Sequence, residues 1–327
     1  MSNSTSQSIE YNNADSFTTS GLVRLKFSIL LALEIPSVVC SLSIFLCFIR
    51  LSELRAKQHN HVVICLLISN FLTATTEIPI SLTYLYNNEF IPPSNSLCFL
   101  WIFSNYIVFG SSFWIMVTAS IQRYILIFYK YRLNTKFKHY FPIVFPPAFF
   151  TLWYIILICF YPCQQQFDYS QLWCSGACYG YQGLISSIDW IISSLMPVLI
   201  IVITNVVLIL SVGHQKYRMQ RARTWRTTRK LVIQLLPISF VYLIIYVPVN
   251  VFALIRLWFD PSFLLDFYMN IFAYFNYFGP LLMPFVCLMS MPEITAQLKN
   301  LYCFSNRVQP QRIRFTASAQ RVPQQTN

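Results

Sequence analysis

The sequence predicts an all-α membrane protein, a bundle of seven transmembrane helices followed by a short amphipathic helix. The first observation is composition: 56% of the 327 residues are hydrophobic and only 10% are charged, against roughly 25% charged in soluble domains. The second is the length of the apolar runs. A membrane-spanning helix needs about 20 apolar residues, and these runs are too long for the alternating strands of a membrane barrel. Helices also pair their own backbone groups in lipid.

Seven such runs follow one another, and each is expected to form one span. They lie at residues 27–49, 62–86, 98–128, 141–162, 185–212, 231–255 and 267–290. The polar segment 1–26 precedes the first span, which is expected to act as the insertion signal because no cleavable signal peptide is apparent. An amphipathic stretch from Pro292 to Tyr302 follows the last span, so the membrane domain covers 27–303. We expect the tail, 304–327, to be disordered.

The distribution of Lys and Arg residues predicts the orientation. They gather in the first, third and fifth connections and in the tail, whereas the opposite side has only Arg24, Lys26 and Arg256. Because cytoplasmic loops are enriched in these residues, the tail is expected inside and the amino terminus outside the plasma membrane. The net charge of +12 then points to anionic lipid headgroups and an acidic cytosolic protein, rather than to nucleic acid. The sequon Asn3-Ser4-Thr5 is a candidate glycosylation site on the outer side, although such triplets also arise by chance.

Four cysteines, Cys98, Cys163, Cys174 and Cys178, fall on the predicted outer side. Oxidising conditions there favour disulfides. Four cysteines allow three complete pairings, so their spacing alone leaves the connectivity open.

Several motifs occur in a consistent order along the spans. Cys98 lies near the start of the third run, and Gln122-Arg123-Tyr124 lies near its end. The other motifs are Asn60, Asn70 and Pro79 in the second run, Trp153 in the fourth, Pro197 in the fifth, Tyr246-Val247-Pro248 in the sixth and Met283-Pro284-Phe285-Val286-Cys287 in the seventh. Taken together, the chain resembles the rhodopsin-like family of G-protein-coupled receptors over residues 27–303. It departs from the family where Gln122 replaces the usual acid, Asn70 the usual aspartate, and Met283 and Cys287 the polar residues of the seventh helix.

The resemblance implies roles for these residues. A disulfide would join Cys98 to the second outer loop, at Cys174 or Cys178. Arg123 would meet a heterotrimeric G protein after the sixth helix moves outward, with Pro248 as a hinge. The implied coupling and switch residues are Gln122, Arg123, Tyr124, Asn70, Pro248 and Pro284.

Carboxylates at membrane depth are the strongest candidates for ligand binding. Glu77 and Asp189 are costly in lipid unless each faces a polar cavity or finds a partner. They favour an agonist with a positive charge, either a basic small molecule or a peptide with a basic residue; alternatively, they are protonated or bonded to Tyr and Asn neighbours. Asn105 stands where amine receptors place an aspartate, which argues against an ordinary aminergic ligand. The helical register adds Tyr106, Tyr246, Asn250 and Tyr277 to the same cavity.

Enzymes and metalloproteins are disfavoured, because the motifs for acyl transfer, phosphate binding and zinc proteases are absent from the sequence. No cofactor or metal site is suggested. The predicted function is therefore a receptor that binds an extracellular ligand and activates a cytosolic G protein. A transporter is the first alternative, although no internal repeat is visible. A ligand-gated channel of the seven-helix odorant type is the second, although its topology is inverted.

Overall fold

A computed structural model describes residues 4–56, 58–87, 89–128, 136–218, 222–259, 267 and 271–303. Within these ranges, seven helical segments are long and apolar enough to cross a membrane, which confirms the predicted bundle. The segments are Gly21–Arg50, Asn60–Asn87, Asn95–Phe128, His139–Phe160, Gly183–His214, Leu236–Arg256 and Ala273–Ser290. Each overlaps one predicted run. The sequon residue Asn3 and the predicted tail lie outside the described residues.

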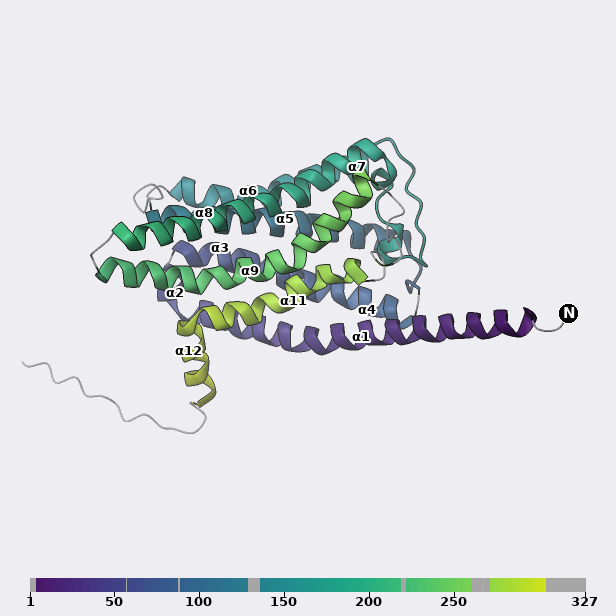
Figure 1. The fold of residues 1–327 in the computed structure, drawn as a ribbon, viewed down its shortest axis with the longest axis horizontal. Coiled ribbons are helices and arrows are strands. Elements are labelled where there is room, and N and C mark those ends of the chain that lie inside the picture. Colours follow the sequence, from purple (N-terminus) through teal and green to yellow (C-terminus); the bar gives the residue numbers. More distant parts are fainter. Residues whose placement is uncertain are drawn as a thin grey trace, which may run out of the picture.

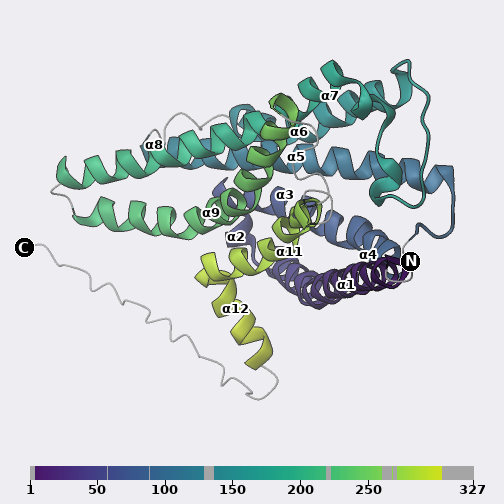
Figure 2. The same cartoon turned by 45° about the vertical axis from the view of Figure 1, so that its right-hand side comes forward.

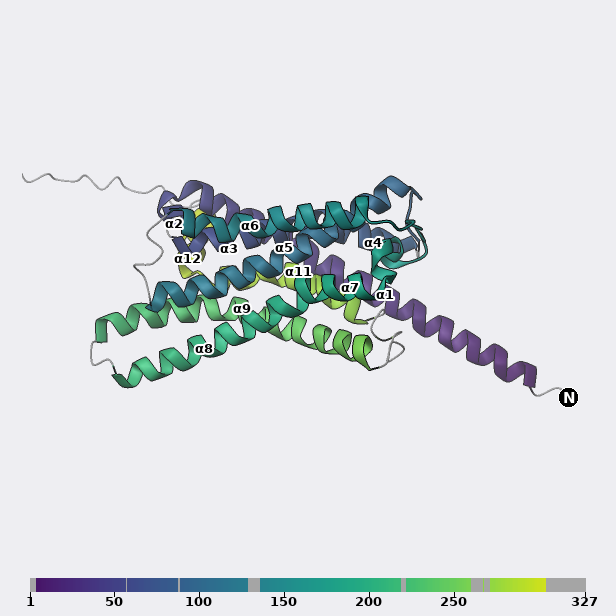
Figure 3. The ribbon, with the colours of Figure 1, turned by 90° about the horizontal axis from the view of Figure 1, so that it is seen from above.

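Several spans are built from more than one element. The bounds are α1 (Ser4–Arg50), α2 (Ser52–Ala56), α3 (Gln58–Leu72), η1 (Thr73–Glu77), α4 (Ile78–Asn87), α5 (Asn95–Phe128), α6 (Lys136–Tyr154), η3 (Ile155–Phe160), η4 (Leu172–Ser175), η5 (Cys178–Tyr181), α7 (Gly183–Trp190), η6 (Ile191–Leu195), α8 (Met196–Arg218), α9 (Ala222–Trp258), α11 (Ala273–Ser290) and α12 (Pro292–Cys303). Figures 1 and 3 show α1 running well past the other helices at its N-terminal end. Figure 2 shows α12 leaving the bundle at an angle to α11, as expected for a membrane-surface helix.

The bundle is organised around α5, which packs against α3, α6, α8 and α9. Its contact with α6 is close because Gly110 has no side chain: a Cβ there would lie 2.8 Å from Cδ1 of Phe150. Large apolar side chains that remain exposed, such as Ile35 on α1, Leu152 on α6 and Ile203 on α8, form the face expected to meet lipid.

The π-helical segments η1, η3 and η6 interrupt three of the described spans, and two of them lie at the predicted ligand residues. The first, η1, ends at Glu77, and η6 begins two residues after Asp189. A π turn holds one residue more than an α turn, so it changes the direction in which the following side chains point. These local irregularities therefore help to determine which side chains face the interior of the bundle.

A long connection between η3 and α7 covers one end of the bundle, which we call the loop end (Figure 1). Two disulfides fix this connection: Cys98–Cys174 ties it to α5, and Cys163–Cys178 closes a ring within it. The predicted link from Cys98 to the connection is thus confirmed, with Cys174 as its partner. Phe90 N donates to the carbonyl of Tyr169 at 2.9 Å and joins the connection to the α4–α5 turn.

Candidate functional site

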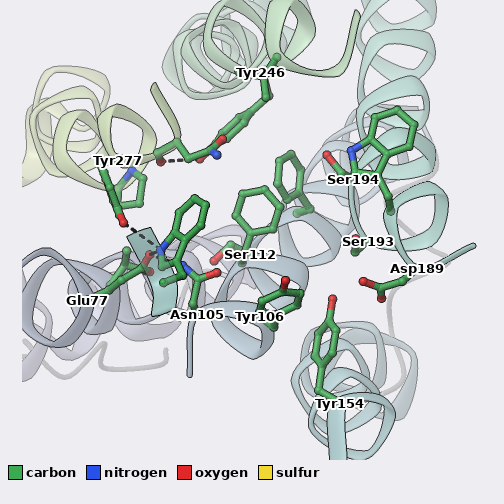
Figure 4. Close-up of a pocket in the computed structure, with 18 of the residues that line it drawn as sticks. Glu77, Asn105, Tyr106, Ser112, Tyr154, Asp189, Ser193, Ser194, Tyr246 and Tyr277 are labelled. Atoms are coloured by element: carbon green, nitrogen blue, oxygen red, sulfur yellow. Dashed lines mark hydrogen bonds between the residues drawn. The ribbon is translucent and has the colours of Figure 1, made fainter. Parts of the chain in front are cut away.

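A cavity of about 240 Å³ opens inside the loop-end half of the bundle. It is mainly aromatic and hydroxylic, and α5, α9, α11, the π segments η1 and η6 and the covering connection all contribute to it (Figure 4). Its walls are formed by Asn70, Thr73, Glu77, Asn105, Tyr106, Phe109, Ser112, Phe113, Tyr154, Trp173, Tyr179, Gly180, Ser186, Asp189, Trp190, Ser193, Ser194, Tyr242, Tyr246, Val249, Asn276, Tyr277 and Pro280.

Most of the side chains proposed from the sequence for ligand binding are brought together here. Those in the cavity wall are Glu77, Asn105, Tyr106, Asp189, Tyr246 and Tyr277. Asn250 is not in the wall: its Oδ1 accepts from Ser194 Oγ at 3.0 Å, and its Nδ2 donates to the carbonyl of Tyr246 at 2.9 Å. Asn250 thus connects η6 to α9 behind the cavity.

Glu77 occupies one side of the cavity and is only 5% exposed (Figure 4). Its Oε1 accepts hydrogen bonds from Asn105 Nδ2 and, at 3.2 Å, from Trp173 Nε1. The same indole N–H lies 3.1 Å from the hydroxyl of Tyr277, which also bonds to Ser81 at 2.8 Å. Among the described residues, the hydrogen-bond partners of this carboxylate are all neutral.

Asp189 occupies the opposite side and is 6% exposed (Figure 4). Trp153 Nε1 donates to its Oδ1 at 2.8 Å, and the hydroxyl of Tyr179 donates to its Oδ2 at 3.1 Å. Tyr154 is a third aromatic neighbour. Burial raises the pKa of Tyr179, which lies in the covering connection, so its hydroxyl remains a neutral donor.

Aromatic rings line the cavity between the two carboxylates. Tyr106 packs edge-on against Tyr154 and Tyr179, with ring centroids 5.3 and 6.0 Å apart. Deeper in the bundle, Phe113 makes an edge contact with Tyr246 at 4.6 Å. Such rings present negative faces to a cation, which makes the wall compatible with a positively charged group.

Asn70 forms the floor of the cavity and is fully buried. Its amide lies beside the hydroxyl of Tyr242 on α9. Neither amide atom makes a hydrogen bond of normal geometry within the described part of the chain. The floor therefore presents polar atoms that a bound molecule can use.

At the other end of α5, Arg123 is 5% exposed and donates from Nη1 to Ser239 Oγ on α9. Gln122 does not face this charge, because its Nε2 donates to the carbonyl of His139 on α6 at 3.2 Å. Tyr124 stacks on Phe128 with ring centroids 4.9 Å apart. The arginine therefore links α5 to α9, and the glutamine links α5 to α6.

The two predicted switch prolines lie where helices can bend. Pro248 lies within α9, which changes direction along its length in Figure 1, and Pro284 lies within α11. Each removes a backbone hydrogen bond. Between these helices, Gly279 leaves room for Tyr246, whose hydroxyl donates to the carbonyl of Asn276 at 3.2 Å.

Sequence reasoning missed Trp173 and Tyr179 as cavity residues. They lie in an irregular segment, where no helical periodicity indicates which way a side chain points. The available signal was their position next to Cys174 and Cys178, because a disulfide fixes the direction of its neighbours. Among the described residues, no three His, Cys, Asp or Glu side chains come together as a metal site.

A seven-helix bundle with a polar cavity beneath a disulfide-fixed connection is the architecture of a membrane receptor. Residues 38–286 match the family described as 7 transmembrane receptor (rhodopsin family). Because this match covers most of the chain, the protein belongs to the rhodopsin family of seven-transmembrane receptors. Among curated proteins, none matches the chain.

Proposed function

We propose that the protein is a plasma-membrane receptor that binds an extracellular ligand in the cavity and activates a heterotrimeric G protein at the opposite end. Family membership supports a receptor role. The Lys and Arg bias supports an extracellular amino terminus and loop end. The Lys and Arg residues that gather in the predicted inner connections support a cytosolic partner with an acidic surface.

The ligand carries a positive charge. This proposal is supported by two observations: Glu77 and Asp189 line one cavity, and within the part of the chain that the structure describes their hydrogen-bond partners are neutral donors. Buried carboxylates are costly when no cation compensates them. A basic small molecule, or a basic side chain of a peptide, would supply that cation and would also contact the aromatic wall.

The test is a screen of basic small molecules and peptides with a G-protein activation readout, followed by substitution of the carboxylates. Glu77→Gln and Asp189→Asn should each lower the potency of the agonist by more than about tenfold, which corresponds to about 1.4 kcal/mol. Glu34→Gln is the matched control, since Glu34 lies in α1 and outside the cavity wall. An uncharged agonist, or unaltered potency in both variants, would reject the charge assignment.

Two further measurements separate a receptor from the other membrane functions. Tags on the termini of the chain should be accessible on intact cells at the amino end only. A channel of the seven-helix odorant type predicts the reverse, and a transporter predicts uptake of a radiolabelled solute. G-protein activation by an agonist, without solute uptake, is the outcome that we expect.

A further inference from the structure

The connection over the loop end contributes a hydrogen-bond donor to each carboxylate of the cavity. Trp173 donates from Nε1 to Glu77 at 3.2 Å, and Tyr179 donates from its hydroxyl to Asp189 at 3.1 Å. Both side chains are also part of the cavity wall. One segment of the chain therefore occupies a hydrogen-bonding position at both acidic sites.

The two donors are anchored in the same way. Trp173 directly precedes Cys174, which is bonded to Cys98 on α5, and Tyr179 directly follows Cys178, which is bonded to Cys163. A disulfide one residue away thus restrains the backbone at each donor. Tyr179 is almost fully buried.

The backbone around Trp173 is unusual. Trp173, Cys174 and Ser175 all have a positive φ, at 54°, 49° and 74°. This left-handed conformation is unfavourable for residues other than glycine, so surrounding contacts must maintain it. The indole bonds to Glu77 and Tyr277 are contacts of this kind.

We propose that Trp173 and Tyr179 are built-in competitors of the ligand, and that a cationic ligand binds by replacing their N–H and O–H donors at Glu77 and Asp189. This inference rests on the proposed function for the charge of the ligand. In the exchange, a neutral donor of the protein leaves each carboxylate, and a donor group of the cationic ligand takes its place. When Trp173 moves away, residues 173–175 can leave their unfavourable left-handed conformation, and this offsets part of the free-energy cost of the movement.

Each carboxylate also has a hydrogen-bond donor from a helix. Asp189 keeps Trp153 as a donor from α6 when Tyr179 leaves, and Glu77 keeps Asn105 from α5 when Trp173 leaves. Neither carboxylate is therefore left without a hydrogen bond during the exchange. Both acids can therefore stay in place while the side chains of Trp173 and Tyr179 move away.

The test measures the accessibility of cysteines introduced on each side of the cavity, in the full-length protein in detergent. Thr73→Cys lies in η1 with Glu77, and Ser193→Cys lies in η6, close to Asp189; both positions line the cavity. The probe is the cationic reagent trimethylammonium-ethyl methanethiosulfonate. Peptide mass analysis measures the rate of labelling at each introduced cysteine separately from labelling of the native free cysteines.

Trp173→Ala should raise the rate at the residue 73 cysteine by about tenfold or more, as expected when a hydrogen bond to a charged group no longer opposes entry. It should have little effect at the residue 193 cysteine. Tyr179→Ala should do the opposite, so each variant is the matched control of the other. If neither variant raises the rate at its own position, or if both raise both rates equally, the proposal is overturned.

Phenylalanine variants keep the test decisive where an alanine variant fails to fold. Trp173→Phe and Tyr179→Phe retain a ring but lose the donor, and each should still raise the rate at its own side. An unchanged rate in both folded variants overturns the proposal.

The anionic reagent sulfonatoethyl methanethiosulfonate separates this inference from the proposed ligand charge. In the Trp173→Ala protein, the cationic reagent should react faster than the anionic one, and Glu77→Gln should remove that preference. Opening without a charge preference would reject the cationic ligand but support the built-in competitors. A charge preference without any rise in rate would support the cationic ligand but reject the built-in competitors.

Discussion

Replacing Ser239 by alanine removes the hydroxyl that accepts a hydrogen bond from Nη1 of Arg123, and so tests the contact between α5 and α9. The arginine is buried, and its Nη2 has no hydrogen-bond partner within the described residues. The substitution therefore leaves a buried cation with still fewer partners. We expect this loss to destabilise the arrangement in which α9 lies against α5.

The magnitude follows from the type of bond. A hydrogen bond to a charged group contributes about 1.5–3 kcal/mol, and about 1.4 kcal/mol changes an equilibrium tenfold. We call the arrangement with α9 against α5 closed, and the arrangement with these helices apart open. If the bond exists only in the closed arrangement, Ser239→Ala raises the population of the open arrangement by about tenfold to a hundredfold. An open state populated at about 1% would then reach about 10% or more, which should raise basal signalling.

The assay is agonist-independent nucleotide exchange on the G protein, measured in membranes at matched receptor levels. Ser120→Ala is the control, because Ser120 is also buried on α5 but its hydroxyl has no hydrogen-bond partner among the described residues. Basal exchange should rise for Ser239→Ala and stay unchanged for Ser120→Ala. Equal basal exchange in the two variants would refute the closing role of the Arg123–Ser239 bond.

Four other substitutions test separate parts of the structure. Arg123→Ala should keep surface expression and ligand binding but lose signalling, and unchanged second-messenger levels would contradict its role. Gln122→Glu should leave basal output unchanged, because residue 122 faces α6 rather than Arg123, and a lower basal output would contradict that orientation. Gly110→Ala should destabilise the packing of α5 on α6 by about 1–3 kcal/mol, because the new methyl group overlaps Phe150, and a thermal unfolding midpoint equal to wild type would argue against that overlap. Cys98→Ser should reduce surface expression by freeing the covering connection, and flow cytometry with an amino-terminal tag measures this effect.

The parts of the fold that depend on hydrophobicity could be predicted from the sequence. The seven apolar runs became the seven spans, because the cost of unpaired backbone groups in lipid leaves little freedom. Glu77 and Asp189 stood out for the same reason, and they line one cavity. Their relevance to a ligand remains a prediction.

Side-chain partners could not be predicted in the same way. Gln122 stands in sequence next to Arg123, yet it bonds to α6, since consecutive residues point to different sides of a helix. Asn250 has the register of a cavity residue but bonds to Ser194 instead. Trp173 belongs to a segment whose left-handed backbone follows no sequence period. These choices depend on neighbours that only the folded chain brings together.

The π turns at Thr73–Glu77 and Ile191–Leu195 have a consequence for comparing this chain with its relatives. Each works as a one-residue insertion within a helix, and one residue corresponds to a rotation of about 100° around an α-helix. A relative without the insertion would present a different face on one side of that point, even where aligned letters agree. An acid that aligns with Glu77 in such a chain would then point at a neighbouring helix or at lipid. A relative should therefore be expected to have an acidic cavity only if it has both the π turn and the acidic residue.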